Sequence, residues 1–202
     1  AATATLLASL PFDHLVFTGS TAVGRKVAQA AAANLTPTTL ELGGKSPAII
    51  DADCDLHDAA LKIAHGKLLN AGQTCIAPDY VLLPRGSEAA FAEAYRAAVA
   101  RLFPYFEGNA DYASIVSPRH LARLRTMLQQ AQTLGAEVQV LQPVAGSPAP
   151  PAQSIGDGVG RQMAPVLVFG ATPAMQLMQE EIFGPVLPVL GYDRLDDAIA
   201  HI

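Results

Sequence analysis

The sequence predicts a mixed α/β fold. Its hydrophobic residues recur with a period of two in some segments, typical of strands, and with a period of about 3.6 in others, typical of helices. The 202 residues, 50% of them hydrophobic, suffice to bury a core without disulfides or a structural metal. The two cysteines, Cys54 and Cys75, cannot form a disulfide framework and indicate a reducing compartment, so we expect a cytoplasmic protein.

The first part of the chain is expected to form a strand, a helix and a second strand. A buried strand over residues 14–18 leads through the turn 19–21 into a helix over 22–34. The next strand, over 38–42, stops at the glycine pair 43–44.

The middle of the chain continues the alternation. A third strand over 47–50 is followed by a helix over 56–70, whose start the aspartates within 51–55 favour by side-chain capping. A short strand over 80–83 ends at a Pro-Arg-Gly turn, and Ser87 is expected to cap a helix that continues to residue 102.

The last part contains one further helix, from Ser117-Pro118 to residue 134, ended by Gly135. Residues 142–160, rich in Pro and Gly, are expected to form a loop. Both chain ends lie inside helix-like runs without caps, so we expect them to be cuts through a longer protein. Strands are expected over residues 137–141, 166–169 and 186–190.

Composition excludes several functions. The net charge is −5 and no Lys/Arg cluster is present, so no nucleic-acid partner is expected. No apolar run reaches the roughly 18 residues of a membrane span, and the start lacks the basic region of a signal peptide. The histidines and cysteines do not cluster, because Cys54 with His57 is too few ligands, so no metal site is expected.

A glycine turn between strand and helix forms the first candidate site, in the segment FTGSTAVG (residues 17–24). Such a turn directs backbone N–H groups and the positive helix end toward an anion. The segment matches neither a P-loop, because Arg25 and Lys26 follow Gly24, nor the three-glycine dinucleotide fingerprint. An anion site at Gly19 and Ser20 and a merely tight turn both remain open.

The second candidate site is an acidic residue within an apolar strand, in the segment LELGGKSP (residues 40–47). A buried carboxylate is costly unless it is paired or functional, so Glu41 is a candidate general base. The alternative is a glutamate at a strand end that is hydrogen-bonded to nearby backbone.

The third candidate site is a cysteine in a loop rich in backbone N–H donors, in the segment NAGQTCIAPDYV (residues 70–81). Backbone N–H groups can stabilise a thiolate at Cys75, although an isolated cysteine is more commonly a small buried hydrophobe. Cys54 has three aspartate neighbours that disfavour a thiolate, so we interpret it as structural.

The fourth segment is EEIFGPVLPV (residues 180–189). Alone it indicates only a turn that leads into a buried strand, with Glu180 and Glu181 on a solvated face.

Together, in this order and spacing, the four segments resemble the aldehyde dehydrogenase superfamily. ELGGKSP is similar to its glutamate signature, GQTC to its cysteine signature and EEIFGPV to its third hallmark, and Glu41 precedes Cys75 by 34 residues, which also fits. The run GQTCIAPDYVL looks most like the class 3 branch, which includes fatty-aldehyde and bacterial coniferyl-aldehyde dehydrogenases.

The resemblance implies NAD(P)-dependent oxidation of a small-molecule aldehyde to a carboxylate. Cys75 would attack the aldehyde, its backbone N–H would help to hold the oxyanion, and Glu41 would activate the hydrolytic water. The cofactor, NAD or NADP, would meet Gly19 and Ser20 at its pyrophosphate, Leu42, Gly43 and Phe183 at its nicotinamide, and Glu181 at the nearby ribose. Ala22, where many relatives carry Glu, is a departure in the phosphate turn.

The resemblance also implies two domains: residues 1–43 as the end of a Rossmann-like cofactor domain and 44–202 as most of the catalytic α/β domain, incomplete at its C-terminus. The full-length parent would be a homodimer, and the isolated piece would be inactive. Two alternative functions are weighed against this one. A semialdehyde or acyl-phosphate reductase also uses a catalytic cysteine but would not need Glu41 as a hydrolytic base. A non-enzymatic relative would be expected to lose Cys75 or Glu41.

Overall fold

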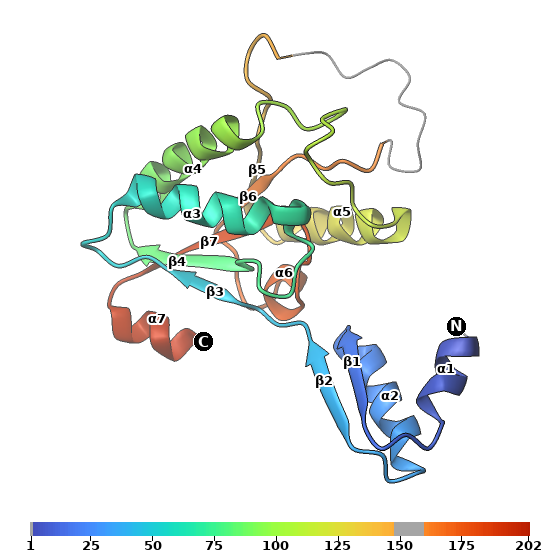
Figure 1. Ribbon diagram of the computed structural model, residues 1–202. Helices are drawn as coiled ribbons and strands as arrows, with labels where there is room; N and C mark the ends of the chain where they lie inside the picture. The colour runs from blue at the N-terminus through green and yellow to red at the C-terminus, as the bar shows by residue number, and fades with distance from the viewer. Residues whose placement is uncertain (1, 148–159) are drawn as a thin grey trace. The chain divides into compact units, whose positions relative to one another are not determined.

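The computed structural model describes residues 2–147 and 160–202, and its backbone forms two compact units, Ala1–Gly44 and Lys45–Ile202 (Figure 1). Each unit contains both helices and strands, so the predicted mixed α/β fold is confirmed.

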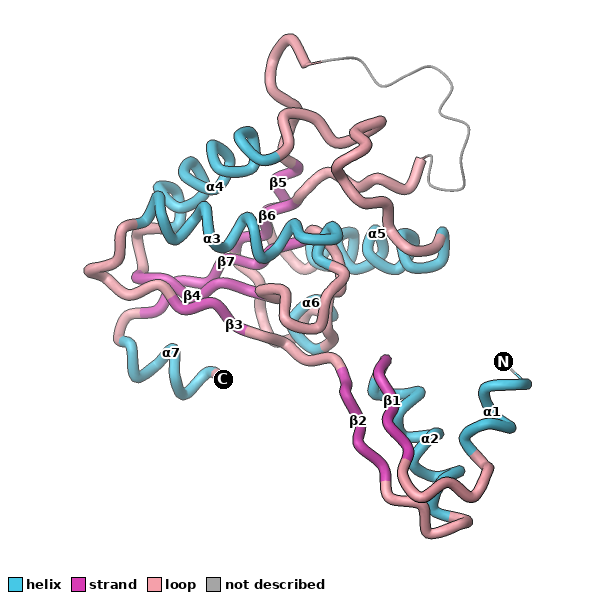
Figure 2. Tube along the Cα trace, viewed as in Figure 1, coloured by secondary structure: helices cyan, strands magenta, loops and turns pink. Residues whose placement is uncertain are grey.

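The first unit is a parallel strand pair with a connecting helix. Its elements are α1 (Ala2–Ala8), β1 (Leu15–Gly19), α2 (Thr21–Ala32) and β2 (Thr38–Leu42). The two strands lie side by side, with Leu15 opposite Thr38 and Gly19 opposite Leu42 (Figure 2). The N-cap of α2 is Ser20, whose hydroxyl accepts a hydrogen bond from the Val23 N–H at 3.4 Å. The expected strand–turn–helix–strand order is confirmed, with boundaries shifted by one or two residues.

The second unit is built around a five-stranded sheet in the order β3-β4-β7-β6-β5, parallel except for β5, which runs antiparallel to β6. Its elements are β3 (Pro47–Ile49), α3 (Leu56–Leu68), the 3-10 helix η1 (Leu69–Gly72), β4 (Tyr80–Pro84), α4 (Glu88–Leu102), α5 (Pro118–Thr133), β5 (Glu137–Val140), β6 (Val166–Phe169), α6 (Gln176–Gln179), β7 (Val186–Tyr192) and α7 (Leu195–His201).

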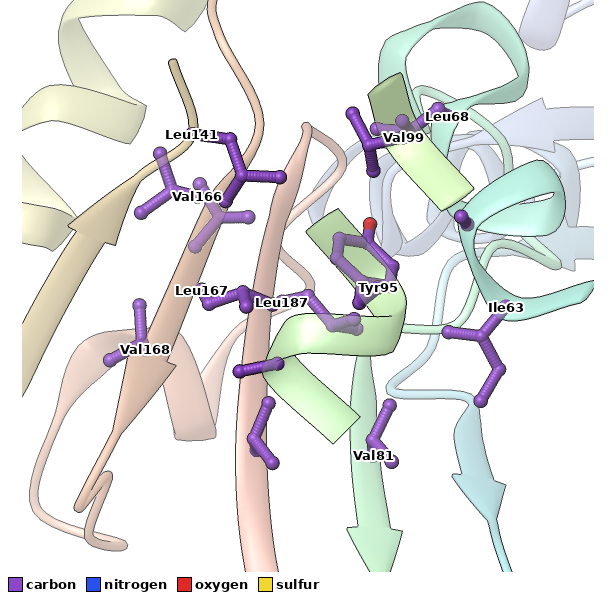
Figure 3. Packing of buried hydrophobic residues seen from close by; sticks show 14 of the residues in the cluster. Ile63, Leu68, Val81, Tyr95, Val99, Leu141, Val166, Leu167, Val168 and Leu187 are labelled. Atoms are coloured by element: carbon purple, nitrogen blue, oxygen red, sulfur yellow. The ribbon is translucent and has the colours of Figure 1, made fainter. Parts of the chain in front are cut away.

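The strand β4, which lies between β3 and β7, is buried on both faces. Val81 and Leu83 belong to the main core with α3 and α4, whereas Tyr80 and Leu82 point to the opposite face, where Ala198 of α7 packs. Figure 3 shows the main core, in which Tyr95 of α4 lies over the sheet beside the strand residue Leu187. Burial on both faces explains why β4 and β7 are near-continuous apolar runs in the sequence.

Local capping follows the sequence at two helices and departs from it at a third. Asp55 accepts hydrogen bonds from the N–H groups of His57 (2.9 Å) and Asp58 (3.1 Å) at the start of α3, and the Ser117 hydroxyl caps α5, the helix that Ser117-Pro118 was expected to open. The predicted Ser87 cap is wrong, because its hydroxyl makes no capping hydrogen bond to α4. Instead the Glu88 carboxylate accepts the Gly86 N–H at 2.7 Å.

Three further details differ from the expectations. The helix after Asp55 ends at Leu68 rather than at residue 70, because η1 and the left-handed residues Asn70 and Ala71 follow. The short helix α6 has too few residues for a helical period to be visible in the sequence, and it was not predicted. Residues 148–159 of the expected 142–160 loop lie outside the described part of the chain. Within the described residues no helix is long and apolar enough to cross a membrane.

Candidate active site

The cysteine loop, residues 69–77, places Cys75 on an exposed turn. The Ala77 N–H donates to the Thr74 carbonyl at 3.2 Å, which closes the turn around Cys75. Asn70 and Ala71 adopt φ values of 52° and 53°, so the chain leaves α3 abruptly. The thiol of Cys75 is exposed, so the alternative of a small buried hydrophobe is wrong for this residue.

The side-chain amide of Gln73 holds this loop in place by hydrogen bonds to backbone groups. Its side chain is buried, and its Nε2 donates to the carbonyls of Asn70 (3.0 Å) and Ser114 (3.1 Å). Its Oε1 accepts the Val116 N–H at 2.8 Å. The amide therefore joins the cysteine loop to the segment that precedes α5, which limits the motion of the backbone next to Cys75.

Two glycines bring the cysteine loop against the loop of residues 180–185. Gly72 has φ +77°, and a Cβ there would lie 2.6 Å from the Gly184 carbonyl carbon. A Cβ on Gly184 would in turn lie 2.6 Å from a methyl group of Leu124 on α5. At residue 72 the opposing atoms are backbone and φ is positive, so only glycine fits there, and the GQTC and EEIFGPV segments are packed backbone to backbone.

Helix α5 holds the 180–185 loop by its carbonyl groups. The guanidinium of Arg123 donates to the carbonyls of Glu181 (3.1 Å) and Ile182 (2.5 Å), and the His120 Nε2 lies 2.6 Å from the Phe183 carbonyl oxygen. Burial lowers the pKa of His120, with the neighbouring Arg123 acting in the same direction and the Phe183 hydrogen bond opposing it. Phe183 itself has φ 51°, an uncommon conformation for a bulky residue.

Asp79 of the cysteine segment joins it to the GGKSP and EEIFGPV segments. It is 3% exposed, forms an ion pair with Lys45 of the GGKSP segment, and accepts the Ile182 N–H at 2.9 Å. Lys45 also donates to the carbonyls of Leu177 (2.8 Å) and Glu180 (3.3 Å). A paired and hydrogen-bonded carboxylate of this kind fixes the segments that meet at it.

The structure brings Cys75, Glu181 and Phe183 together on neighbouring loops of the second unit. Glu180 is exposed as expected, but Glu181 is half-buried, so its placement on a solvated face is wrong. Cys54 lies in the exposed segment before α3, with its sulfur 3.7 Å from the Asp55 carbonyl.

The other five sequence candidates lie in the first unit. Gly19 ends β1, directly before the α2 cap Ser20, and Glu41, Leu42 and Gly43 lie at the end of β2. Glu41 is exposed in this structure, so the expectation that its apolar strand buries it is wrong: β2 belongs to a two-stranded sheet, and alternate residues along it differ in burial.

Sequence reasoning missed four residues of this site: Gln73, Asp79, Arg123 and Lys67. Lys67 was nevertheless detectable, because it occupies the helical stripe of Ala60, Ile63 and Ala64, where an apolar residue is expected. The contacts that join the remaining three to other segments span 34 or more positions in the sequence, which a local pattern does not report.

Known proteins resemble this chain over nearly its whole length. The model of the aldehyde dehydrogenase family matches residues 1–202. A probable coniferyl aldehyde dehydrogenase from Pseudomonas aeruginosa is 48% identical over 193 residues, covering 96% of this chain and 38% of that protein. The dimeric NADP-preferring aldehyde dehydrogenase of Canis lupus familiaris is 38% identical, covering 95% of this chain and 39% of that protein.

The crystal structure of betaine aldehyde dehydrogenase from Staphylococcus aureus in complex with NAD+ matches with a TM-score of 0.82 at 28% identity. That match covers 100% of this chain and 39% of the other, so the chain spans about two fifths of the length of such relatives. On the family match over its whole length, the chain belongs to the aldehyde dehydrogenase family.

Proposed function

We propose that this chain carries the catalytic cysteine and the hydrolytic base of an NAD(P)-dependent aldehyde dehydrogenase. The Cys75 thiolate attacks the aldehyde carbon, and the backbone N–H of Cys75 helps to hold the resulting oxyanion. After oxidation of this thiohemiacetal, Glu41 removes a proton from the water that attacks the thioester, which releases the carboxylate and the thiolate.

One observation carries the proposal: an exposed thiol on a loop that is held by hydrogen bonds of a buried amide and by a tight backbone contact. Gln73 holds the loop from the 114–116 segment, Gly72 packs it against Gly184, and Asp79 follows it directly into β4. A nucleophile must be exposed to substrate yet fixed in position, and this loop supplies both conditions to Cys75.

The residues present fit a dinucleotide. The first turn of α2 contains no acidic side chain, Ser20 caps it, and it follows directly on β1, so its positive end is suited to a pyrophosphate at Gly19 and Ser20. We propose that Glu181 binds the ribose next to the nicotinamide, and that Leu42, Gly43 and Phe183 line the ring. When bound, the nicotinamide of NAD or NADP accepts the hydride that the thiohemiacetal loses.

Exposed apolar side chains near the cysteine support an apolar aldehyde. Ile76 is 81% exposed, Leu69 is 56% exposed, and Val116, which Gln73 holds beside the loop, is 69% exposed. Single exposed apolar residues need no explanation, but three on one pair of joined segments favour an apolar ligand. Together with the coniferyl aldehyde dehydrogenase relative, this supports an aromatic aldehyde such as coniferyl aldehyde.

The two units would have separate roles. We assign residues 1–43 to the end of the cofactor domain and residues 44–202 to the catalytic domain, one residue from the division between the two compact units. A semialdehyde or acyl-phosphate reductase remains the second candidate, because it shares the cysteine chemistry.

The test is a chimera in which this chain replaces the segment that it matches in the Pseudomonas aeruginosa relative. Formation of reduced cofactor from coniferyl aldehyde with NAD or NADP is expected, Cys75→Ser should abolish it, and Cys54→Ser should leave it unchanged. Activity in the Cys75→Ser chimera contradicts the proposal. Product formation that requires phosphate, giving an acyl phosphate in place of a free carboxylate, selects the reductase.

A further inference from the structure

His120 on α5 contacts both the backbone and the side chain of Phe183. Its Nε2 lies 2.6 Å from the Phe183 carbonyl oxygen. Its ring also meets the Phe183 ring edge to face, with 6.0 Å between the ring centroids and 74° between the ring planes. One imidazole therefore acts on the peptide group and on the aromatic ring of the same residue.

The contacts of this imidazole fix the position of its proton. A carbonyl oxygen only accepts hydrogen bonds, so Nε2 must donate to Phe183. Nδ1 lies 3.5 Å from the Nε of Arg123, a group that only donates, so Nδ1 must accept. Burial lowers the pKa of His120, which keeps the ring neutral at pH 7. Of the two neutral tautomers, the one with its proton on Nε2 satisfies both contacts.

Phe183 has a backbone conformation that a bulky residue adopts only with support. Its φ is 51°, and the next residue, Gly184, lies against the backbone of Gly72 and against a methyl group of Leu124. Such conformations persist where surrounding contacts over-determine them. The His120 hydrogen bond supplies such a contact at the carbonyl group of the strained residue itself.

One face of α5 holds this part of the loop. His120, Arg123 and Leu124 are three and four positions apart, which places them on the same side of the helix. Arg123 and His120 together bind the carbonyls of residues 181–183, and Leu124 contacts Gly184. Of these three helix residues, His120 is the one in ring contact with the aromatic side chain.

We propose that His120 is a positioning residue that sets the direction of the Phe183 ring, and with it one wall of the nicotinamide site. A site residue is precise only where its own rotamer is held by supporting contacts, and His120 supplies them to Phe183. The inference rests on the proposed function for the role of Phe183 at the nicotinamide, but the contact between the two side chains does not.

NMR of the 202-residue chain at pH 7 tests the contact. The ring nitrogens of His120 should show the neutral tautomer with its proton on Nε2, and nuclear Overhauser effects should join the His120 and Phe183 rings. The opposite tautomer, or the absence of these effects, overturns the inference without any substitution.

A matched pair of variants then separates the hydrogen bond from the space that the ring fills. His120→Gln keeps an N–H donor near the position of Nε2 and should retain the amide shifts of Phe183 and Gly184. His120→Met has a similar length but no donor, and it should move both signals. His65→Met, at an exposed histidine of α3, is the control and should leave them unchanged. Phe183 and Gly184 signals that are the same in His120→Met as in the unsubstituted chain overturn the inference.

The cofactor arm uses the chimera described above with the cofactor that it accepts, NAD or NADP. His120→Met should raise the KM for the cofactor roughly fivefold or more, the usual effect of one lost hydrogen bond, and His120→Gln should stay within about twofold of the parent. An unchanged KM in His120→Met overturns the inference that His120 sets the nicotinamide wall. A chimera without any Cys75-dependent activity contradicts the proposed function instead, and the NMR result then decides the inference alone.

Discussion

The backbone of Gly72 lies directly against the carbonyl group of Gly184, where a Cβ atom would come within 2.6 Å of the carbonyl carbon. This contact joins the segment that contains the cysteine to the segment that contains Glu181 and Phe183. Both partners are backbone groups, so the contact cannot be relieved by a side-chain rotation. The distance between the two segments is therefore set by the absence of a side chain at residue 72.

Gly72→Ala should be strongly destabilising. The substitution adds steric overlap with Gly184 to the strain of a positive φ, and we expect a loss of about 2–4 kcal/mol in the free energy of unfolding. Urea denaturation, monitored by circular dichroism, measures this loss in the free energy of unfolding. Gly135→Ala is the matched control, because Gly135 has φ +94° but open space around it, and it should cost only about 1–2 kcal/mol. Equal losses in the two variants would show that the Gly72–Gly184 contact is not tight.

Gln73→Leu should loosen the cysteine loop. Leucine has a similar volume but leaves the Val116 N–H and the Ser114 carbonyl without their buried partner, at a cost of about 1–3 kcal/mol. Hydrogen exchange by mass spectrometry should show faster exchange in residues 70–77 and 114–116, while β6 stays protected. Unchanged exchange in both segments would contradict the anchoring role of this amide.

The sequence was informative about features that depend on near neighbours. Aspartate capping at the start of α3 and a helix that opens at Ser117-Pro118 were predicted, because a cap and the N–H groups that it binds lie within three residues. The pair of Lys45 and Asp79, 34 residues apart, and the bond from Ile182 to Asp79, 103 residues apart, depend on strand order, which local patterns do not contain.

The errors at Glu41, Ser87 and Glu181 have a related cause. The apolar neighbours of Glu41 indicate a strand, but they do not show whether both faces of that strand are covered. The acidic pair at residues 180–181 suggests two solvated side chains, although the Glu181 carbonyl is bound by Arg123 and its side chain is half-buried. The Ser87 hydroxyl makes no capping hydrogen bond, and the neighbouring Glu88 carboxylate accepts the N–H of Gly86 in the turn before α4.

Cys75 should be alkylated faster than Cys54. Both thiols are exposed, so access does not distinguish them, but three aspartates lie within three positions of Cys54 in the sequence, whereas no charged residue lies within three positions of Cys75. Iodoacetamide labelling of the chain with peptide mapping measures the two rates. Cys54→Ser should leave the rate at Cys75 unchanged, and faster labelling of Cys54 in the parent would contradict the assignment of the nucleophile.

Glu41→Gln should slow the hydrolysis of the thioester more than its formation. Loss of a general base typically costs about 10²–10⁴-fold, so the chimera should show a burst of reduced cofactor followed by a slow steady state. Stopped-flow absorbance separates the two phases. Glu93→Gln, which changes an exposed glutamate on α4, is the control and should retain full turnover. Steady-state turnover that is unchanged in Glu41→Gln would exclude the role of this residue as base.

Lys67→Met should make the chain more stable at neutral pH, which is the opposite of what a substitution in the core usually does. Burial lowers the pKa of Lys67 from 10.5 to about 8, so the unfolded chain binds this proton more tightly than the folded chain does. The charged amine therefore destabilises the folded state by about 3 kcal/mol below pH 8, and this penalty disappears as the pH rises from about 8 to 10.5. Methionine has a similar length and no charge, so the variant should gain most of that free energy at pH 7 and lose its advantage near pH 10.5.

Urea denaturation at a series of pH values measures the difference in the free energy of unfolding between Lys67→Met and the unsubstituted chain. Lys62→Met, which removes an exposed charge from the same helix, should change stability by less than about 0.5 kcal/mol at every pH. A gain at pH 7 would mean that the unsubstituted chain retains a destabilising buried charge. A loss of stability at pH 7 would show instead that the Lys67 ammonium is well paired in the folded protein.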